Sequence, residues 1–553
     1  MTHYKRWGMT LAILLLVMLV VIPIFCIFLT SIFPNGSLDL LAPLRIFLEA
    51  GLRRTFFNTL RLGVLVVVGT TFFALPLAWI MAKTSLRKHN WLDVVLMIPF
   101  MTPPYIGSMG WILFIQPNGY FEQFMPFISK PSSYLLNLWG MVLIMSLQTF
   151  PFLYVILRNA LLQVSGSLED AALVHGGKAL YTLRRVILPL LLSSYAMGAL
   201  LIFVKTIAEF GTPATFGRRI GYFVMTTEIQ QYTSSWPIDF SKATSLATIL
   251  LSTCLIVWYL SSMISRRFTY HLVSGKGFKE KVYVLKRWQT CVAGSYIIAL
   301  LTLAIGVPYF SILVASVMKL RGGGLVWPNF TLLHYEKLLT WGSESMEALL
   351  NSLSLSLLTA TICVVLGTGF ALAIEKSRTW PQRIIDLFSL LPNTVPGIVM
   401  VVGLIIVWDA PWMPIPLYNT YGMVVLTYVI FFLPYTVQYV KANYSQIDES
   451  LFQAGRVFGG KTLYLLRRII LPLLLPGILA GWMMTFIISI RELVAALMIL
   501  PPAMQTSATY IYAQFEQGNL ALGMAMAVIS VALTIAMLLG INKISSKRKW
   551  YVE

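Results

Sequence analysis

The segment GRVFGGKT, residues 455–462, is the first stretch whose residue types and spacing could do chemistry. It fits the pattern Gly, four residues, Gly-Lys, then Ser or Thr, which in a P-loop wraps backbone N–H groups and a lysine around nucleotide phosphates. A true P-loop also needs a preceding β-strand that aims the loop at the phosphates. Residues 419–454 instead form an apolar stretch too long for a strand, followed by a polar, helix-compatible one. The context therefore argues against a nucleotide site.

Other catalytic patterns are missing from the sequence. The five histidines are scattered, and the chain contains neither an HExxH motif nor a Cys-His cluster. The four cysteines lie inside apolar runs without a CxxC spacing, so we interpret them as small core residues. We expect no metal site, no cofactor in this chain and no enzymatic activity of its own.

The composition indicates a membrane protein. Of 553 residues, 58% are hydrophobic and 11% are charged, whereas soluble proteins carry about 25% charged residues. Apolar runs of about 20 residues, enough to cross a bilayer, recur along the whole chain. The net charge of +20 comes from basic residues in short loops between these runs, which disfavours a nucleic-acid partner. The sequence predicts an all-α polytopic protein in a lipid bilayer.

The apolar runs form two sets of six, which returns both termini to one side. Most of the 41 Lys and Arg residues lie in the terminus and loops of that side, which the positive-inside rule assigns to the cytoplasm. The first run is longer than a signal-peptide core and lacks a typical cleavage site, so we interpret it as a retained helix. The predicted spans are 8–33, 57–82, 91–115, 138–157, 190–210, 243–264, 290–318, 349–374, 384–408, 421–440, 473–490 and 520–541.

An internal repeat relates the two sets. Residues 168–191, LEDAALVHGGKALYTLRRVILPLL, align without a gap with residues 451–474, LFQAGRVFGGKTLYLLRRIILPLL. A second alignment pairs the regions around Asn58 and Asn351. The chain therefore contains two parallel modules, which we place at 1–264 and 289–553, joined by a basic connector at 265–288.

The repeat also explains the P-loop pattern. In the first copy Ala172 stands where Gly455 is, and Ala179 stands where Thr462 is, so the pattern fails there. The copies share Gly-Gly-Lys, Leu-Tyr, Arg-Arg and Ile-Leu-Pro-Leu-Leu. The P-loop match is a chance overlay on this different motif.

That motif resembles the EAA loop of binding-protein-dependent ABC importer permeases: Glu-Ala-Ala, three residues, Gly, nine residues, then Ile-x-Leu-Pro. The two matching loops are 168–189 and 451–472, and each half of the chain looks like one six-helix permease of the type I importer fold. The resemblance implies that the following loop residues dock ATPase subunits: Asp170, Ala171, Ala172, Gly176 and Gly177 in the first loop, and Gln453, Ala454, Gly455, Gly459 and Gly460 in the second. Gln453 lacks the charge of the family's glutamate, so the second contact is expected to be tuned differently.

The resemblance further implies the partners and the location. Two copies of an ABC ATPase would bind ATP and Mg and dock on the two loops, and an extracytoplasmic solute-binding protein would deliver the solute. The chain would lie in the bacterial inner membrane with both termini cytoplasmic. A fused pair of this kind is similar to ferric-iron importer permeases, and also to those for thiamine or aminoethylphosphonate.

Ionisable residues at the ends of two apolar runs are candidates for the translocation pathway, because charge is costly to bury in lipid. They are Glu209, Arg491 and Glu492, and the two glutamates occupy the same repeat position. Carboxylates suit a hard cation such as ferric iron, whereas Arg491 would suit a phosphonate. A local ion pair, such as Glu209 with Lys205, is the structural alternative. The alternative class of protein is a secondary transporter, which can also be built from parallel repeats but needs no docking loop.

Overall fold

The computed structural model describes residues 3–34, 36–127, 131–267, 282–374, 379–448 and 450–549. Within these ranges every regular element is a helix, and β-pairing is limited to two isolated bridges. Ten helices are long and apolar enough to cross a membrane, and two bent helix pairs raise the number to as many as 12. The predicted all-α polytopic fold is confirmed. Much of the predicted connector, residues 268–281, lies outside the described residues.

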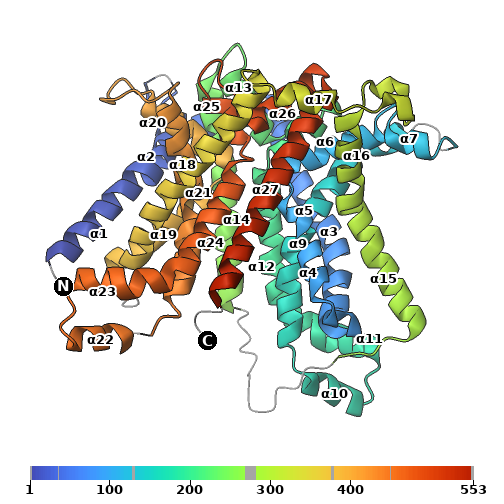
Figure 1. Ribbon diagram of the computed structural model, residues 1–553, viewed down its shortest axis with the longest axis horizontal. Helices are drawn as coiled ribbons and strands as arrows, with labels where there is room; N and C mark the ends of the chain where they lie inside the picture. The colour runs from blue at the N-terminus through green and yellow to red at the C-terminus, as the bar shows by residue number, and fades with distance from the viewer. Residues whose placement is uncertain are drawn as a thin grey trace.

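The first half of the chain supplies the blue to green helices of Figure 1. Its principal elements are α1 (His3–Leu16), α2 (Ile22–Ile32), α3 (Ala50–Lys83), α4 (Asn90–Leu96), α5 (Ile98–Met101), α6 (Pro104–Ile115), α7 (Tyr120–Phe124), α8 (Pro131–Leu135), α9 (Leu138–Gln163), α10 (Gly166–Val174), α11 (Ala179–Thr182), α12 (Leu188–Ala208), α13 (Met225–Ser234) and α14 (Phe240–Arg267).

The second half repeats this order in yellow-green to red. Its principal elements are α15 (Arg287–Leu301), α16 (Val307–Val317), α17 (Leu333–Leu338), α18 (Glu344–Ala373), α19 (Trp380–Leu390), α20 (Gly397–Trp408), α21 (Tyr421–Tyr444), α22 (Ser450–Val457), α23 (Thr462–Leu465), α24 (Leu471–Ser489), α25 (Val494–Ile499), α26 (Ser507–Gln517) and α27 (Leu520–Lys549).

The third apolar run of each half is bent rather than a single straight span. Trp91–Met101 meets Pro104–Ile115 at 89°, and Trp380–Asn393 meets Gly397–Trp408 at 109°. Each break falls at a proline, Pro103 or Pro396, which has no N–H to continue the helical hydrogen bonds. The single spans expected at 91–115 and 384–408 are therefore two-part elements.

Four prolines lie within helical runs directly after a π-helical turn. In one of these turns the Leu188 N–H bonds to the Leu183 carbonyl just before Pro189. The wider turn absorbs the missing N–H without ending the run. The four positions are Pro23, Pro189, Pro308 and Pro472.

Each half is organised around three packed helices: α3, α9 and α12 in the first, and α18, α21 and α24 in the second. Small and hydroxyl side chains line these contacts. Thr70 and Thr149 hydrogen-bond at 2.9 Å, and Thr436 and Thr485 at 3.0 Å. Gly367 allows Thr436 to approach closely. Such residues let helix backbones pack tightly where lipid offers no hydrophobic driving force.

The first helices of each half cross to the other half. α1 packs on α19, α2 packs on α20, and α16 packs on α6. In Figure 1 the blue α1 and α2 accordingly lie beside helices of the second half, and α15 and α16 lie beside α3 and α6. The two modules are therefore interlocked.

The ends of the bundle differ in what they carry. The short helices α10 and α22 lie at the lower edge in Figure 1, and α13, α17 and α26 lie at the upper edge. The start of α1 and the end of α27 both point toward the edge with α10 and α22. This arrangement agrees with an even number of crossings.

Candidate functional site

The two repeated loops share one backbone geometry. In the first, Gly176 lies two residues after the end of α10 and has a φ of +79°, and in the second Gly459 lies two residues after the end of α22 and has a φ of +78°. A side chain at such an angle is strained, so glycine is the natural residue there. The Gly177 N–H then bonds to the Ala172 carbonyl at 2.8 Å, which closes the end of α10. The double glycine thus turns the chain sharply between two short helices.

The second glycine of each pair is required by space. A Cβ on Gly177 would lie 2.7 Å from the Ala172 carbonyl oxygen, and one on Gly460 would lie 2.7 Å from the Gly455 carbonyl oxygen. The segment GRVFGGKT begins within the helix α22. The element before α22 is another helix, α21, rather than a strand. The structure confirms that this segment lacks the context of a P-loop.

The same side chains are exposed in both loops. Val174 and Val457, which are repeat partners, are each 84% exposed. Tyr181 and Tyr464, also partners, are 57% and 59% exposed. Exposed apolar residues in the loops between spans are candidates for a protein interface.

The predicted docking residues lie on or beside this face. Asp170, Ala171, Gln453 and Ala454 are exposed, whereas Ala172 and Gly455 are half-buried under it. Val174 and Val457 project from these short helices beside the exposed small side chains of Ala171 and Ala454.

An acidic residue that sequence reasoning missed holds the first loop in place. Glu169 is fully buried, and its Oε1 lies 2.7 Å from the Nζ of Lys83, which is 3% exposed. The Tyr283 hydroxyl donates to Glu169 Oε2 at 2.6 Å. Burial and this hydrogen bond raise the pKa of Tyr283, which keeps its hydroxyl protonated and able to donate.

In the second loop, apolar packing is found at the position that corresponds to Glu169. Phe452 occupies the repeat position of Glu169, and its ring meets that of Tyr444 edge-on with centroids 6.3 Å apart. Phe452 also packs against the cluster that contains Ile470 and Leu474. The change from Glu to Phe between the copies was the one signal in the sequence that could have singled out Glu169.

The candidate pathway residues meet where the two halves face each other. A cavity of about 310 Å³ is lined by Lys205 and Glu209 of the first half and by Arg491 and Glu492 of the second. An adjoining cavity of about 260 Å³ shares Lys205 and Glu492 and extends toward Tyr435. The structure thus brings the predicted charged residues together, although they are far apart in the sequence.

The two glutamates make matching backbone contacts. Both carboxylate oxygens of Glu209 accept from the Thr212 N–H at 3.1 Å. Glu492 Oε1 accepts from the N–H groups of Val494 and Ala495 at 2.9 and 3.1 Å. Thr212 and Ala495 are repeat partners. Each glutamate therefore caps the chain that follows it while also lining the cavity.

The basic side chains Lys205 and Arg491 make contacts other than the local ion pair that we considered from the sequence. Lys205 forms no ion pair with Glu209, and its ammonium instead lies 5.0 Å from the centroid of the Phe152 ring. The local pair that we considered is therefore wrong. Arg491 donates to the Met101 carbonyl across the boundary between the halves.

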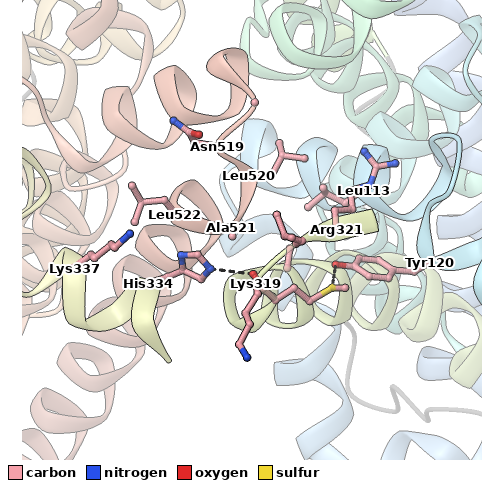
Figure 2. Close-up of a pocket in the computed structure, with 14 residues that line it drawn as sticks. Leu113, Tyr120, Lys319, Arg321, His334, Lys337, Asn519, Leu520, Ala521 and Leu522 are labelled. Carbon is pink, nitrogen blue, oxygen red and sulfur yellow. Dashed lines mark hydrogen bonds between the residues drawn. The ribbon is translucent and has the colours of Figure 1, made fainter. Parts of the chain in front are cut away.

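A third cavity, of about 460 Å³, lies at the opposite edge from the loops, between α16, α17 and the start of α27 (Figure 2). Lys319, His334 and Lys337 line it, and the dashed line in Figure 2 marks the contact between His334 and the Met318 carbonyl at 2.9 Å. The Nζ of Lys319 donates a hydrogen bond to the Pro328 carbonyl at 2.8 Å. We assign this cavity no role in transport.

A protein-family comparison matches the chain twice, over residues 74–270 and 363–551, to the binding-protein-dependent transport system inner membrane component. The chain belongs to this family. Each match contains one of the two repeated loops, so the fused two-module permease is confirmed. Such a permease is a transport subunit rather than an enzyme, and membership favours it over the secondary transporter.

Two relatives extend over most of the permease, and a third matches less than half of it. It is 24% identical over 541 residues to the ferric transport system permease protein FbpB of Actinobacillus pleuropneumoniae, covering 96% of this chain and 77% of that protein. It is also 24% identical to the Fe(3+)-transport system permease protein FbpB 2 of Haemophilus influenzae, covering 88% of each. A putative 2-aminoethylphosphonate transport system permease protein, PhnV of Salmonella typhi, is 24% identical over 43% of this chain and 89% of its own length.

Proposed function

We propose that this permease moves a solute across the bacterial inner membrane by alternating access, driven by ATP hydrolysis on separate subunits. Two copies of an ABC ATPase, which carry ATP and Mg, dock on the loops at 168–189 and 451–472. A solute-binding protein delivers the solute at the opposite edge, and both termini are cytoplasmic. The observation that carries the proposal is the repeated loop with matching exposed apolar residues, Val174 and Val457.

The geometry of the loops supports docking in two ways. The exposed face of α10 and α22 combines small residues with larger apolar ones, Leu168 and Val174 on α10 and Leu451 and Val457 on α22, which suits insertion into a groove. Each loop is also joined through a π turn to a membrane helix, α12 or α24, that ends at the charged cavity. A displacement of either loop can therefore be transmitted along one helix to Glu209 or Glu492.

Ferric iron is the solute that we propose. The full-length relatives with ferric names support it, as do two carboxylates at the interface between the halves, since hard cations prefer oxygen ligands. Within the described residues no group of three or more His, Cys, Asp or Glu side chains could hold a metal ion. This suits a passage better than a storage site, because a tightly bound ion would leave slowly.

A phosphonate is the second candidate. Lys205 and Arg491 line the same cavity as the glutamates, and both can bind an anionic oxygen. The relative named for 2-aminoethylphosphonate transport aligns with less than half of the chain. We therefore place this solute after iron.

The test is uptake by proteoliposomes that contain the permease, its ATPase and its binding protein. Labelled iron, labelled aminoethylphosphonate and labelled thiamine are supplied in parallel with ATP inside. We expect iron to accumulate and the others to stay at background. Accumulation of either of the others without iron would refute the assignment of the solute but leave the transport mechanism intact.

A further inference from the structure

The connector between the two halves is fixed to the first docking loop through Tyr283. The Tyr283 N–H donates to the Lys83 carbonyl at 2.7 Å, and the Tyr283 carbonyl accepts from the Ser85 N–H at 3.1 Å. These bonds form an isolated parallel bridge with Thr84. The Tyr283 ring also stacks on Trp79, with centroids 6.1 Å apart. Backbone and side chain together hold the connector against the end of α3.

The same tyrosine reaches the docking helix α10. Its hydroxyl and the Lys83 ammonium donate to the two different oxygens of Glu169, at 2.6 and 2.7 Å. Lys83 also donates to the Val164 carbonyl at 3.1 Å, just before α10 begins. Because Glu169 is fully buried, it cannot touch an ATPase and can act only by setting the position of α10. Removing one partner from such a buried charged group is costly.

The second half holds its loop without an equivalent contact to Phe452, the repeat partner of Glu169. The Phe452 ring packs on Tyr444 and on neighbouring apolar residues. Apolar packing is non-directional, so it tolerates small shifts of α22 that hydrogen bonds of fixed length and angle would resist. The two loops are thus alike in their exposed faces and different in the contacts made at the Glu169 and Phe452 position.

We propose that Tyr283, Lys83 and Glu169 form a clamp through which the connector positions the first docking helix, so that the two ATPase-docking loops are unequal. The inference rests on the proposed function, because it takes α10 and α22 to be the docking helices. In this proposal the connector that joins the two modules also positions α10. The three residues are positioning residues, since each acts through α10.

Equivalent reporters can be placed on the two loops. Val174→Cys and Val457→Cys introduce thiols at repeat-related positions of equal exposure, 84%. They are made singly in a chain whose four native cysteines are replaced, and each is cross-linked to titrated, purified ATPase with a thiol-to-amine reagent. The apparent affinity at each loop is read from the titration.

Tyr283→Phe then removes only the hydroxyl and keeps the ring on Trp79. We expect the apparent affinity at position 174 to fall about tenfold, the loss typical of one hydrogen bond to a charged group, and that at position 457 to stay unchanged. The maximal ATPase rate should recover at high ATPase concentration, because the variant changes the position of the loop rather than the chemistry. The matched control is Tyr296→Phe, whose hydroxyl donates to the Phe73 carbonyl of α3 at 2.7 Å and should affect neither loop.

A second variant removes both charges of the buried pair, so that neither Lys83 nor Glu169 is left without its partner. Lys83→Met combined with Glu169→Leu replaces the buried pair by apolar side chains of similar size, a change that folded proteins often tolerate. It should reproduce the loss at position 174 alone. An unchanged affinity at position 174 in both variants, or an equal fall at both positions, would overturn the clamp. Failure of either reporter to cross-link in the parent chain would instead refute docking itself, and with it the proposed function.

Discussion

Gly110 of α6 lies directly against the backbone of Pro308 in α16, on the other half of the chain. A Cβ on Gly110 would come within 2.6 Å of the Pro308 carbonyl oxygen. The repeat partner of Gly110, Gly403, stands in the same relation to Pro23, also at 2.6 Å. The two halves are therefore locked together by a pair of glycine–proline contacts, each between a bent third-span element and the first helix of the opposite module.

Enlarging these glycines should loosen the interlock. Gly110→Val or Gly403→Val forces backbone to move, and we expect a loss of about 1–3 kcal/mol, typical of overpacking. The measurement is the midpoint of thermal unfolding of the purified permease in detergent. Gly369→Val is the control, because a Cβ at that helical glycine of α18 meets nothing within 4 Å. Equal unfolding midpoints for the Gly403 and Gly369 variants would contradict the close contact between Gly403 and the Pro23 backbone.

The docking loops should fail when their left-handed glycines are replaced. Gly176→Trp and Gly459→Trp put a large side chain at φ near +79° and +78°, which strains the turn between the short helices. We expect normal membrane insertion but little bound ATPase, with the larger effect in the first loop, where Asp170 retains a charge.

The control for this pair is Gly221→Trp. Gly221 also has a positive φ, +66°, but lies after α12, in the segment that precedes α13. It carries the same kind of strain away from the loops and should bind ATPase normally. Normal ATPase binding by the Gly176 and Gly459 double variant would remove the docking assignment.

Substitutions can distinguish the negative charge of Glu209 and Glu492 from their hydrogen bonds to backbone N–H groups. Glu209→Gln and Glu492→Gln keep an oxygen that can accept from the Thr212 and Ala495 N–H groups but remove the negative charge. We expect iron uptake to fall at least about tenfold, in line with the cost of losing one charged contact, while the unfolding midpoint changes little. Glu209→Leu removes the cap as well and should also lower the midpoint. Unchanged iron uptake in the Gln double variant would leave the carboxylates with a structural role only.

The orientation of the chain follows from the side on which the docking loops lie. A reporter fused after Glu553 should be active as a cytoplasmic fusion. A thiol introduced at Gly221, in the loop after α12, should react with a membrane-impermeant reagent added outside whole cells. Labelling of a thiol at Val174 instead of the one at Gly221 would reverse the topology and separate the loops from any cytoplasmic ATPase.

Sequence reasoning reached the features that repeat. Span positions, the two modules and the glycine turns at Gly176 and Gly459 all follow from local patterns: apolar run length, self-alignment and the need for φ > 0. These depend on neighbouring residues, so a single sequence carries them.

Features that depend on distant contacts were not reached. The buried Lys83–Glu169 pair joins segments far apart in the chain, and Tyr283 reaches it from the connector. The crossing of α1 and α2 to the other half likewise depends on which apolar surfaces fit. An apolar helix shows in its sequence that it spans, but not which neighbour it will pack on.

The central claim is that transport is powered by ATPase subunits docked on both loops. Its most direct test is iron uptake by proteoliposomes that hold the permease and its binding protein, with and without the ATPase, under an ATP supply or under an ion gradient alone. The account predicts accumulation only with both ATPase and ATP, and its loss in the Gly176→Trp, Gly459→Trp double variant. Accumulation driven by the gradient without the ATPase would contradict it and identify a secondary transporter.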